Sequence, residues 1–527
     1  MEDAAAAAAS QDPESLPSQV SAKGELLREE CVRLSSPVMP QRQLGTLFLE
    51  ARLKDGFLHR EASFECEKYA NILRVQLLSG VNTFELLEDV LGDERAGPFK
   101  LGSEYARAKA ILRSLRVVEY IGPAIIETIF SSENVKLQIQ VFELYNSPFS
   151  LANTGEAEED LGEIFQMPHA RFEGVWDELV FDSEIKADLI WMMTNILRFS
   201  QAFAASHLRR NLNPIILLYG PPGTGKTSLC QGLAQKISIR LGAQYKSTRL
   251  IQIKTATLLS KYFSESSKHV DEIFTKISHM CEEDPERFIC VVIDEVESIA
   301  SSRQFSAKEG ESFDSLRATN ALLTGLDRAA KFSNVVFLCT SNMRDVLEPA
   351  FLDRCGIQEL VGPPSVSAQY EILRSILQKL IQCKVIDSDS DFPLFDEAEY
   401  QAVFAPQKPG PKLLGVVKLV RNANSSLCAN ISGRSLAQLP EKALMRYLRD
   451  EDCDVDTALR FMEKAILDTP HQQTTSADPL GEVSQGKRSW DQFLEKECVA
   501  HAREMVETCR VGVAVRANDR DETAVEL

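Results

Sequence analysis

The feature that most constrains this chain is an apolar run that leads directly into a glycine-rich loop. Ile215-Ile-Leu-Leu-Tyr219 is typical of a buried strand, and Gly220-Pro-Pro-Gly-Thr-Gly225-Lys226-Thr227 follows it at once. Apolar residues from Leu229 to Ile237 then recur at helical spacing. A strand, a glycine-rich loop and a helix in this order predict a loop whose backbone N–H groups surround phosphates. The flanking strand and helix disfavour the alternative of an ordinary glycine-rich turn.

The polar residues of this loop suit nucleotide chemistry. Lys226 can reach the terminal phosphates, and the Thr227 hydroxyl can ligate Mg²⁺. ATP and Mg²⁺ are therefore the expected cofactors. The predicted nucleotide contacts in the loop are Gly220, Pro221, Pro222, Gly223, Thr224, Gly225, Lys226, Thr227 and Ser228.

A second apolar run ends in two carboxylates. Phe288-Ile-Cys-Val-Val-Ile precedes Asp294 and Glu295. On a neighbouring strand, Asp294 would join Thr227 as a Mg²⁺ ligand and Glu295 would polarise the attacking water. The alternative, an acidic strand end in solvent, is disfavoured by the phosphate loop upstream. It does fit Glu297, which is expected to be a solvated bystander.

A third apolar run, Val335-Val-Phe-Leu-Cys, ends in Thr340-Ser341-Asn342. Asn342 can hydrogen-bond both water and phosphate, which predicts a sensor of the γ-phosphate. The competing interpretation is a helix N-cap, because Ser and Asn are also preferred there.

The order of elements predicts the fold class α/β. Between residues 166 and 364, short strands rich in β-branched residues alternate with helical stretches. This order predicts a parallel sheet flanked by helices on both faces. From 365 to 467 the pattern is helical, which predicts a small helical domain. That pattern is clearest at Tyr370, Leu373, Ile376, Leu377 and Leu380.

The remaining segments are assigned from composition. Residues 1–25 are rich in Ala, Ser and Pro and predict a disordered leader. We interpret residues 26–152 as a folded α+β domain. It ends in a strand over 135–141, in which apolar and polar residues alternate. The Gly-rich and acidic stretch 153–165 predicts a linker, and 468–527 predict a partly disordered extension with a helix-like piece around 490–506.

Charge and cysteine usage narrow the function classes. The chain has 58 basic and 77 acidic residues among 527, a net charge of −19, which disfavours a nucleic-acid partner. The 12 cysteines include no CxxC pair, which favours reduced, buried thiols. Neither a secretory leader nor an apolar run of membrane-spanning length is visible, so an intracellular protein with no membrane partner is expected.

Together these motifs resemble the AAA+ family. The helical segment that joins them is also part of the resemblance and reads Arg317-Ala-Thr-Asn320-Ala-Leu-Leu-Thr-Gly-Leu-Asp327. More narrowly, the chain resembles the pachytene checkpoint AAA+ ATPases, which remodel HORMA-domain proteins. The strings that carry this resemblance are Phe172-Glu-Gly-Val-Trp176-Asp-Glu-Leu, Ser260-Lys-Tyr-Phe-Ser-Glu-Ser266, Ile293-Asp-Glu-Val-Glu-Ser298, Phe351-Leu-Asp-Arg354, Gly362-Pro-Pro and Ser432-Gly-Arg434. The resemblance implies a P-loop AAA+ domain (166–364), a small helical lid (365–467) and an N-terminal domain that binds substrate or adaptor.

Two arginines receive roles through the resemblance. Arg354 would be the arginine finger that reaches a neighbouring subunit's γ-phosphate, and Arg434 would be a second sensor at a helix start. Many AAA+ proteins carry two arginines near the finger position, whereas Cys355 and Gly356 follow here. The alternative for each is a surface arginine paired with a carboxylate.

The resemblance also places Lys261, Tyr262 and Phe263 in a loop that projects into a central pore. Flat aromatic rings can hold an extended chain without reading its sequence. Core packing of both rings is the alternative, and the polar flanks disfavour it. Which of Tyr262 and Phe263 dominates stays open.

The predicted function is an ATP-driven homo-hexameric remodeller of HORMA-domain proteins, with or without an adaptor, in meiotic chromosome-axis or checkpoint control, in nucleus and cytoplasm. One alternative is an ATP-switched binding scaffold, which Glu295 disfavours because a pure switch does not require a water-activating carboxylate. The other is a nucleic-acid motor, which the net charge disfavours.

Overall fold

The structure is a computed structural model of the chain. It describes residues 45–55, 83–85, 88–92, 103–122, 129–131, 134–146, 162–182, 184–206, 213–255, 266–302, 313–388, 391–425, 431–449 and 453–468. The chain divides into two compact units, Met1–Glu143 and Leu144–Leu527. The predicted leader, most of the predicted C-terminal extension and the three predicted pore residues lie outside the described residues.

The first unit contains a small mixed sheet. β1 (Gly45–Leu53) pairs antiparallel with β3 (Leu112–Ile121) and parallel with β5 (Val135–Phe142). The alternation predicted for 135–141 is present, because Val135, Leu137, Ile139 and Val141 are all buried. Helix α3 (Ser103–Ile111) and the pair β2 (Thr83–Glu85) and β4 (Ile129–Ser131) complete the α+β unit, as predicted.

The second unit is built on a six-stranded sheet in the order β11-β7-β10-β9-β8-β6. Its parallel strands are β7 (Ile215–Tyr219), β8 (Ser247–Lys254), β9 (Arg287–Asp294), β10 (Val335–Ser341) and β11 (Ile357–Leu360). An antiparallel strand, β6 (Glu163–Met167), closes the edge beside β8. Because β7, β9 and β10 are neighbours, the residues after each strand meet at one edge of the sheet.

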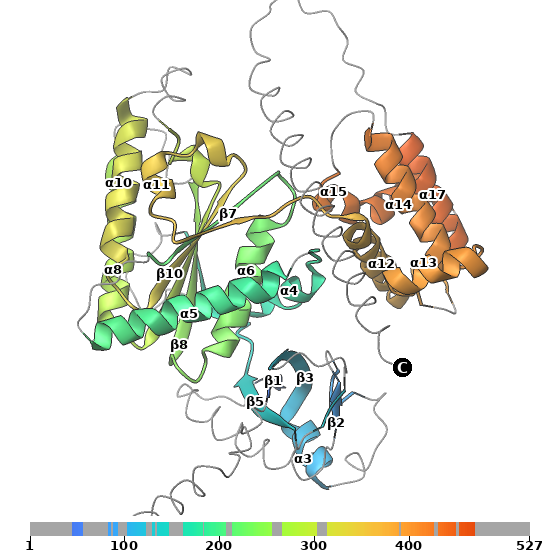
Figure 1. Ribbon diagram of the computed structural model, residues 1–527, viewed down its shortest axis with the longest axis horizontal. Helices are drawn as coiled ribbons and strands as arrows, with labels where there is room; N and C mark the ends of the chain where they lie inside the picture. Colours follow the sequence, from blue (N-terminus) through green and yellow to red (C-terminus); the bar gives the residue numbers. More distant parts are fainter. Residues whose placement is uncertain are drawn as a thin grey trace, which may run out of the picture. The chain divides into compact units, whose positions relative to one another are not determined.

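Helices cover both faces of this sheet (Figure 1), which explains why its strands are continuously apolar. On β7, Ile215 and Leu217 join one core cluster, while Ile216 and Leu218 join the other. The first cluster is covered by α8 (Ser266–Glu283), α10 (Phe313–Ala329) and α11 (Pro349–Leu352). The second is covered by α4 (Val175–Glu178), α5 (Ile185–Ala205) and α6 (Lys226–Arg240). The predicted α/β fold is confirmed.

A helical lid follows the sheet. Its helices are α12 (Val366–Gln382), α13 (Phe395–Phe404), α14 (Pro409–Ser425), α15 (Gly433–Ala437), α16 (Leu439–Tyr447) and α17 (Val455–Leu467). They enclose a separate apolar core that includes Tyr370, Leu373 and Leu377 of α12. Ser365 caps α12 by accepting from the backbone N–H of Ala368.

Two predicted boundaries need correction. The linker was predicted over 153–165, but β6 begins at Glu163, and Phe165 is buried in the sheet. Glu163 was placed in the linker because it continues an acidic stretch, and in the structure its carboxylate forms ion pairs with Arg171 and Lys254. The N-terminal domain was predicted to end at 152, whereas the second unit begins at Leu144. Within that unit the backbone of Tyr145 bonds to Pro168 and Ala170.

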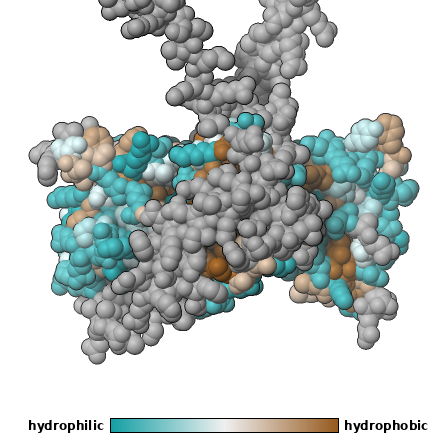
Figure 2. All heavy atoms as spheres, turned by 90° about the horizontal axis from the view of Figure 1, so that it is seen from below, coloured by the Kyte–Doolittle hydropathy of each residue, from teal (hydrophilic) through white to brown (hydrophobic). Residues whose placement is uncertain are grey.

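The described surface in Figure 2 is mostly hydrophilic, with apolar residues in separate spots. Among the helices that the structure describes, none is both long and apolar enough to span a membrane.

Candidate functional site

The phosphate loop is shaped by three glycines with positive φ, namely Gly220 (145°), Gly223 (76°) and Gly225 (97°). A Cβ on Gly220 would lie 2.3 Å from the carbonyl oxygen of Val361, and one on Gly223 would lie 2.8 Å from Ser432. Side chains are therefore excluded both by conformation and by space. The loop ends where α6 begins at Lys226, so the helix N-terminus faces the position of the phosphates.

Lys226 is buried and extends across the site. Its Nζ donates to the carbonyl oxygens of Gly220 and Pro221 and to Oδ1 of Asn342, each at 2.8 Å. Burial lowers the pKa of the Lys226 ammonium, and the carboxylates of Glu297 and Asp294 oppose that shift. An incoming phosphate would offer this ammonium charged acceptors in place of neutral ones.

Asp294 and Thr227 meet at the same edge. The Thr227 hydroxyl donates to Oδ1 of Asp294 at 2.8 Å, so both predicted Mg²⁺ ligands lie together. Thr340 also donates to this carboxylate, and its hydroxyl accepts from the backbone N–H of Glu295 at 3.1 Å. Hydroxyl and carboxylate oxygens are ligands that Mg²⁺ prefers, so this donor set fits the metal. Thr340 was not singled out in the sequence, although it precedes Asn342 by only two positions.

Glu295 stands at the end of β9 with its side chain exposed and φ at 55°, a conformation that is uncommon for a non-glycine residue. Such backbone conformations are concentrated at functional sites. The turn holds Glu295 beside Asp294 but outside its hydrogen bonds with Thr227 and Thr340, which leaves its carboxylate available to a solvent molecule.

Asn342 lies between two charged groups. Its side chain accepts from Lys226, and its backbone N–H donates to Oε1 of Glu297 at 3.1 Å. The prediction that Glu297 is a solvated bystander is therefore wrong. Glu297 lies in the 3-10 helix η4 (Val296–Ser298), which follows β9, and the turn at Glu295 directs this segment toward β10.

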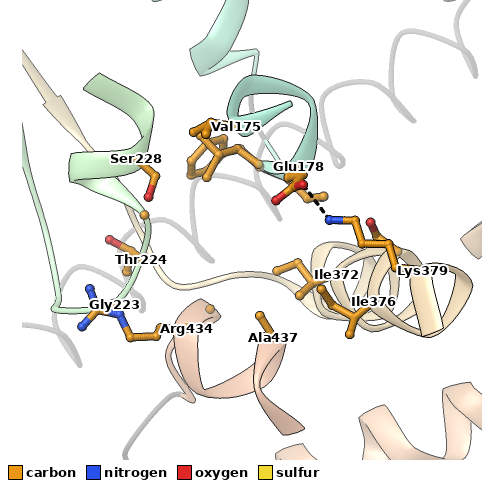
Figure 3. A pocket seen from close by; sticks show the side chains of 16 residues that line it. Val175, Glu178, Gly223, Thr224, Ser228, Ile372, Ile376, Lys379, Arg434 and Ala437 are labelled. Atoms are coloured by element: carbon orange, nitrogen blue, oxygen red, sulfur yellow. Dashed lines mark ion pairs between the residues drawn. The ribbon is translucent and has the colours of Figure 1, made fainter. Parts of the chain in front are cut away.

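A cavity of 340 Å³ lies between the phosphate loop and the lid. Figure 3 shows Gly223, Thr224 and Ser228 on the loop side and Ile372, Ile376 and Ala437 on the lid side. Its mixture of apolar walls and a phosphate loop suits a purine nucleoside attached to phosphates. The sequence did not mark Val180, Phe181, Ile372 or Ile376 as site residues, and Ile376 was noted only for its helical spacing. The string from Phe172 onward was quoted for the family resemblance alone, although it contains Val175, Glu178 and Leu179 of the lining.

Contacts join the lid to the ATPase domain around this cavity. Lys379 of α12 forms an ion pair with Glu178 of α4, with 2.7 Å between Nζ and Oε1 (Figure 3). At the other end of α12, the Asp182 carboxylate accepts from the backbone N–H of Ser365 at 2.9 Å. The lid is therefore joined to the ATPase domain by direct contacts at both ends of α12.

Arg434 lies where a second sensor would be required. Its backbone N–H donates to the carbonyl oxygen of Gly223 at 3.0 Å, and its side chain lines the cavity. The Ser432 hydroxyl caps α15 by accepting from the N–H of Ser435, which places Arg434 in the first turn. The structure thus brings Arg434 to the same loop as Lys226, although the two are far apart in the sequence.

Arg354 is not brought to this site by its own chain. Its guanidinium forms two bonds of 2.8 Å to the carboxylate of Asp327, and Nη1 donates to the carbonyl oxygen of Ala350 at 2.7 Å. In the single chain Arg354 therefore adopts the arginine–carboxylate pair weighed as the alternative. A finger that acts on another subunit is compatible with this pair, because Arg354 remains partly exposed.

The predicted pore residues Lys261, Tyr262 and Phe263 lie outside the described residues. The structure describes the elements on either side, β8, which ends at Lys254, and α8, which begins at Ser266.

Removal of the Lys226 ammonium provides the first test of this site. We expect Lys226→Ala to weaken ATP binding by roughly 10- to 100-fold, because a hydrogen bond between charged groups contributes about 1.5–3 kcal/mol. Binding of a fluorescent ATP analogue measures this effect. Lys236→Ala, on the same helix, is the matched control. Wild-type affinity in the Lys226 variant would contradict the phosphate assignment.

Comparison with known proteins gives two adjacent matches. Residues 216–363 match the AAA family, the ATPase family associated with various cellular activities, and residues 365–469 match the TRIP13-like, AAA+ ATPase lid C-terminal domain. The chain is also similar to proteins called pachytene checkpoint protein 2 homolog. The Mus musculus protein is 35% identical over 336 residues, which cover 63% of this chain and 75% of that protein. The Homo sapiens protein is 35% identical over 334 residues, which cover 62% and 74%.

Among solved structures, C. elegans PCH-2 matches with a TM-score of 0.56 and 26% sequence identity. The match covers 80% of this chain and 98% of the other. It therefore extends well beyond the residues that form the phosphate loop.

Proposed function

The chain belongs to the pachytene checkpoint protein 2 family of AAA+ ATPases, and from this we propose that it uses ATP hydrolysis to remodel HORMA-domain proteins as a homo-hexamer. The observation that carries the proposal is the cavity between the phosphate loop and the lid, whose walls come from two parts of the second unit. A nucleotide there contacts both parts, so its hydrolysis changes the free energy of the contacts that join them.

Each residue of the site has one role in the proposed chemistry. Lys226 and the loop N–H groups bind the phosphates, while Thr227 and Asp294 hold Mg²⁺, which neutralises phosphate charge when bound. Glu295 accepts a proton from the attacking water, and Asn342 orients the γ-phosphate. Arg434 contacts the nucleotide from the lid.

A closed ring is proposed because Arg354 would have to come from a neighbour to stabilise the transition state, and the family resemblance implies six subunits. Its position on Asp327, in a pair on the outside of α10, leaves the chain's own nucleotide without a finger. A closed ring gives every site one such neighbour.

HORMA-domain proteins are the proposed substrates, engaged by the loop that contains Lys261, Tyr262 and Phe263, with or without an adaptor. The proposed setting is meiotic chromosome-axis or checkpoint control in nucleus and cytoplasm. Nucleic acid is not part of the proposal, because the net charge of −19 repels phosphate backbones. No membrane partner is proposed.

The pore loop provides the test of this function. We expect Tyr262→Ala combined with Phe263→Ala to leave ATP hydrolysis largely intact while it removes the conversion of a purified HORMA-domain protein. Loss of two rings removes apolar contact of roughly 1.5–3 kcal/mol each when fully buried. Hydrolysis rate, thermal stability and conversion should be measured on one preparation.

The matched control removes a pair of exposed rings elsewhere in the chain. Tyr400 and Phe404 on α13 are 68% and 71% exposed, with ring centroids 5.0 Å apart. Their double alanine variant should retain conversion. Intact conversion in the Tyr262 and Phe263 variant would refute the pore role, and a joint loss of stability and hydrolysis would indicate that the rings pack in the core.

Two other functions are distinguished by the same preparation. A scaffold switched by ATP would bind HORMA-domain protein without any dependence on hydrolysis. A nucleic-acid motor would show hydrolysis stimulated by DNA or RNA, with a strong dependence on salt.

A further inference from the structure

Glu297 carries a carboxylate that the proposed chemistry does not use. It follows Glu295 by two positions, in η4, and is half-buried. One oxygen, Oε1, accepts from the backbone N–H of Asn342 at 3.1 Å. The other, Oε2, is buried and has no hydrogen-bond partner within the described residues. A carboxylate in this situation is costly, so some interaction must offset its burial.

The ammonium of Lys226 interacts electrostatically with this carboxylate. The Glu297 carboxylate is the main electrostatic influence that opposes the effect of burial on the pKa of Lys226. Lys226 in turn donates to Oδ1 of Asn342. Asn342 is therefore held at both ends, by Glu297 through its backbone and by Lys226 through its side chain.

These two contacts differ in what nucleotide binding does to them. Lys226 would exchange its contact with the neutral Asn342 side chain for charged phosphate acceptors if ATP were bound. The contact from Glu297 is to the backbone N–H and need not change. After ATP binds, Glu297 is the group that still fixes the start of the Asn342 turn.

We infer that Glu297 is a positioning residue, which holds the backbone of Asn342 so that its amide side chain points at the phosphate end of the site. This inference rests on the ATPase site assigned above. The bond links the turn after β9, which begins at Glu295 next to Asp294, to the turn after β10, which carries Asn342. Glu297 thus couples the water-activating carboxylate to the phosphate sensor without contacting either reactant.

The test distinguishes the effect of the hydrogen bond between Glu297 and Asn342 from the effect of the negative charge of Glu297. We expect Glu297→Ala to lower kcat for ATP roughly 10-fold, because one hydrogen bond to a charged acceptor is lost. Affinity for ADP should change by less than about twofold, since Asn342 acts on the γ-phosphate. Glu297→Gln retains an oxygen that can accept from Asn342, so kcat should recover to within about threefold of wild type. Asp345→Ala is the matched control, because Asp345 is an exposed carboxylate in η5 (Arg344–Val346), just after the same turn.

Other results would overturn the inference. If Glu297→Gln is as slow as Glu297→Ala while both proteins remain fully folded, the charge beside Lys226 matters and the hydrogen bond does not. If Glu297→Ala loses ADP binding and thermal stability together with kcat, the role is structural. Asn342→Ala distinguishes failure of the site itself: full activity in that variant would refute the sensor assignment, whereas a slow Asn342 variant beside a fully active Glu297→Ala variant would refute only the positioning role.

Discussion

Glu295→Gln is expected to lower ATP turnover by on the order of 100-fold or more, because general-base catalysis contributes roughly 10²- to 10⁴-fold. The substitution keeps the size of the side chain and removes only its ability to accept a proton. Nucleotide affinity should be retained, since the Glu295 side chain makes no contact with Lys226 or Asp294 among the described hydrogen bonds. Turnover is measured by phosphate release, and retention by the nucleotide that stays bound after gel filtration.

A matched control lies at the other end of the same strand. Glu286 precedes β9 and forms an exposed ion pair with Lys246, which precedes β8, at the ends of the strands opposite the phosphate loop. Glu286→Gln should hydrolyse ATP at the wild-type rate. Normal turnover by Glu295→Gln would remove the basis for the assigned site, because the residue would then be only an exposed carboxylate in an uncommon backbone conformation.

Arg354→Ala is expected to lower hydrolysis by on the order of 10³-fold while ATP affinity is preserved. A finger acts on charge that develops in the transition state, so its removal affects kcat and leaves ground-state binding almost unchanged. The single chain supports this separation, since Arg354 bonds to Asp327 and Ala350 and to none of the nucleotide-site residues in the described contacts.

Arg328→Ala is the matched control for Arg354, because Arg328 forms a comparable exposed pair with Asp271 at 2.7 Å. Loss of such a pair costs up to about 1 kcal/mol of stability and no activity. Mixing tests whether Arg354 acts on a neighbour. If Arg354→Ala is doped into wild-type protein and activity falls only in proportion to the wild-type fraction, the residue is not shared between subunits.

From the sequence alone, site residues could be proposed where they lie within continuous motifs. The phosphate loop requires glycines at fixed positions and a strand before it, and Gly220, Gly223 and Gly225 all have positive φ. Asp294 could be assigned because an apolar run ended in a carboxylate. In both cases the local sequence contains the element and the reactive group together.

Residues whose role depends on distant contacts were missed. Glu297 looked like an exposed acid, because nothing near it in the sequence shows that Asn342, on another strand, would donate to it. Ile376 fits the helical period of α12 as well as its core residues do, yet it faces the nucleotide cavity. Helical spacing identifies the turn of a helix but not which of two neighbouring surfaces an apolar side chain meets.

The outermost strand of the sheet, β6, was missed for a related reason. β6 is short, begins with Glu163 and follows an acidic stretch, so composition favoured a linker. Its place is fixed by antiparallel pairing from Glu163 with Gln252 to Met167 with Thr248. Pairing of this kind is a property of two segments far apart in the chain, and one segment read alone does not contain it.

The central claim is that this ATPase remodels a folded protein, and amide hydrogen exchange of a purified HORMA-domain protein tests it most directly. Protected core amides exchange only when the fold opens, so forced opening is visible as faster exchange. With ATP and the wild-type chain, the account predicts faster exchange across the HORMA core, and with Glu295→Gln it predicts the slow exchange of the substrate alone. Vigorous ATP hydrolysis by the wild-type chain with unchanged exchange, in the presence and absence of candidate adaptors, would contradict it.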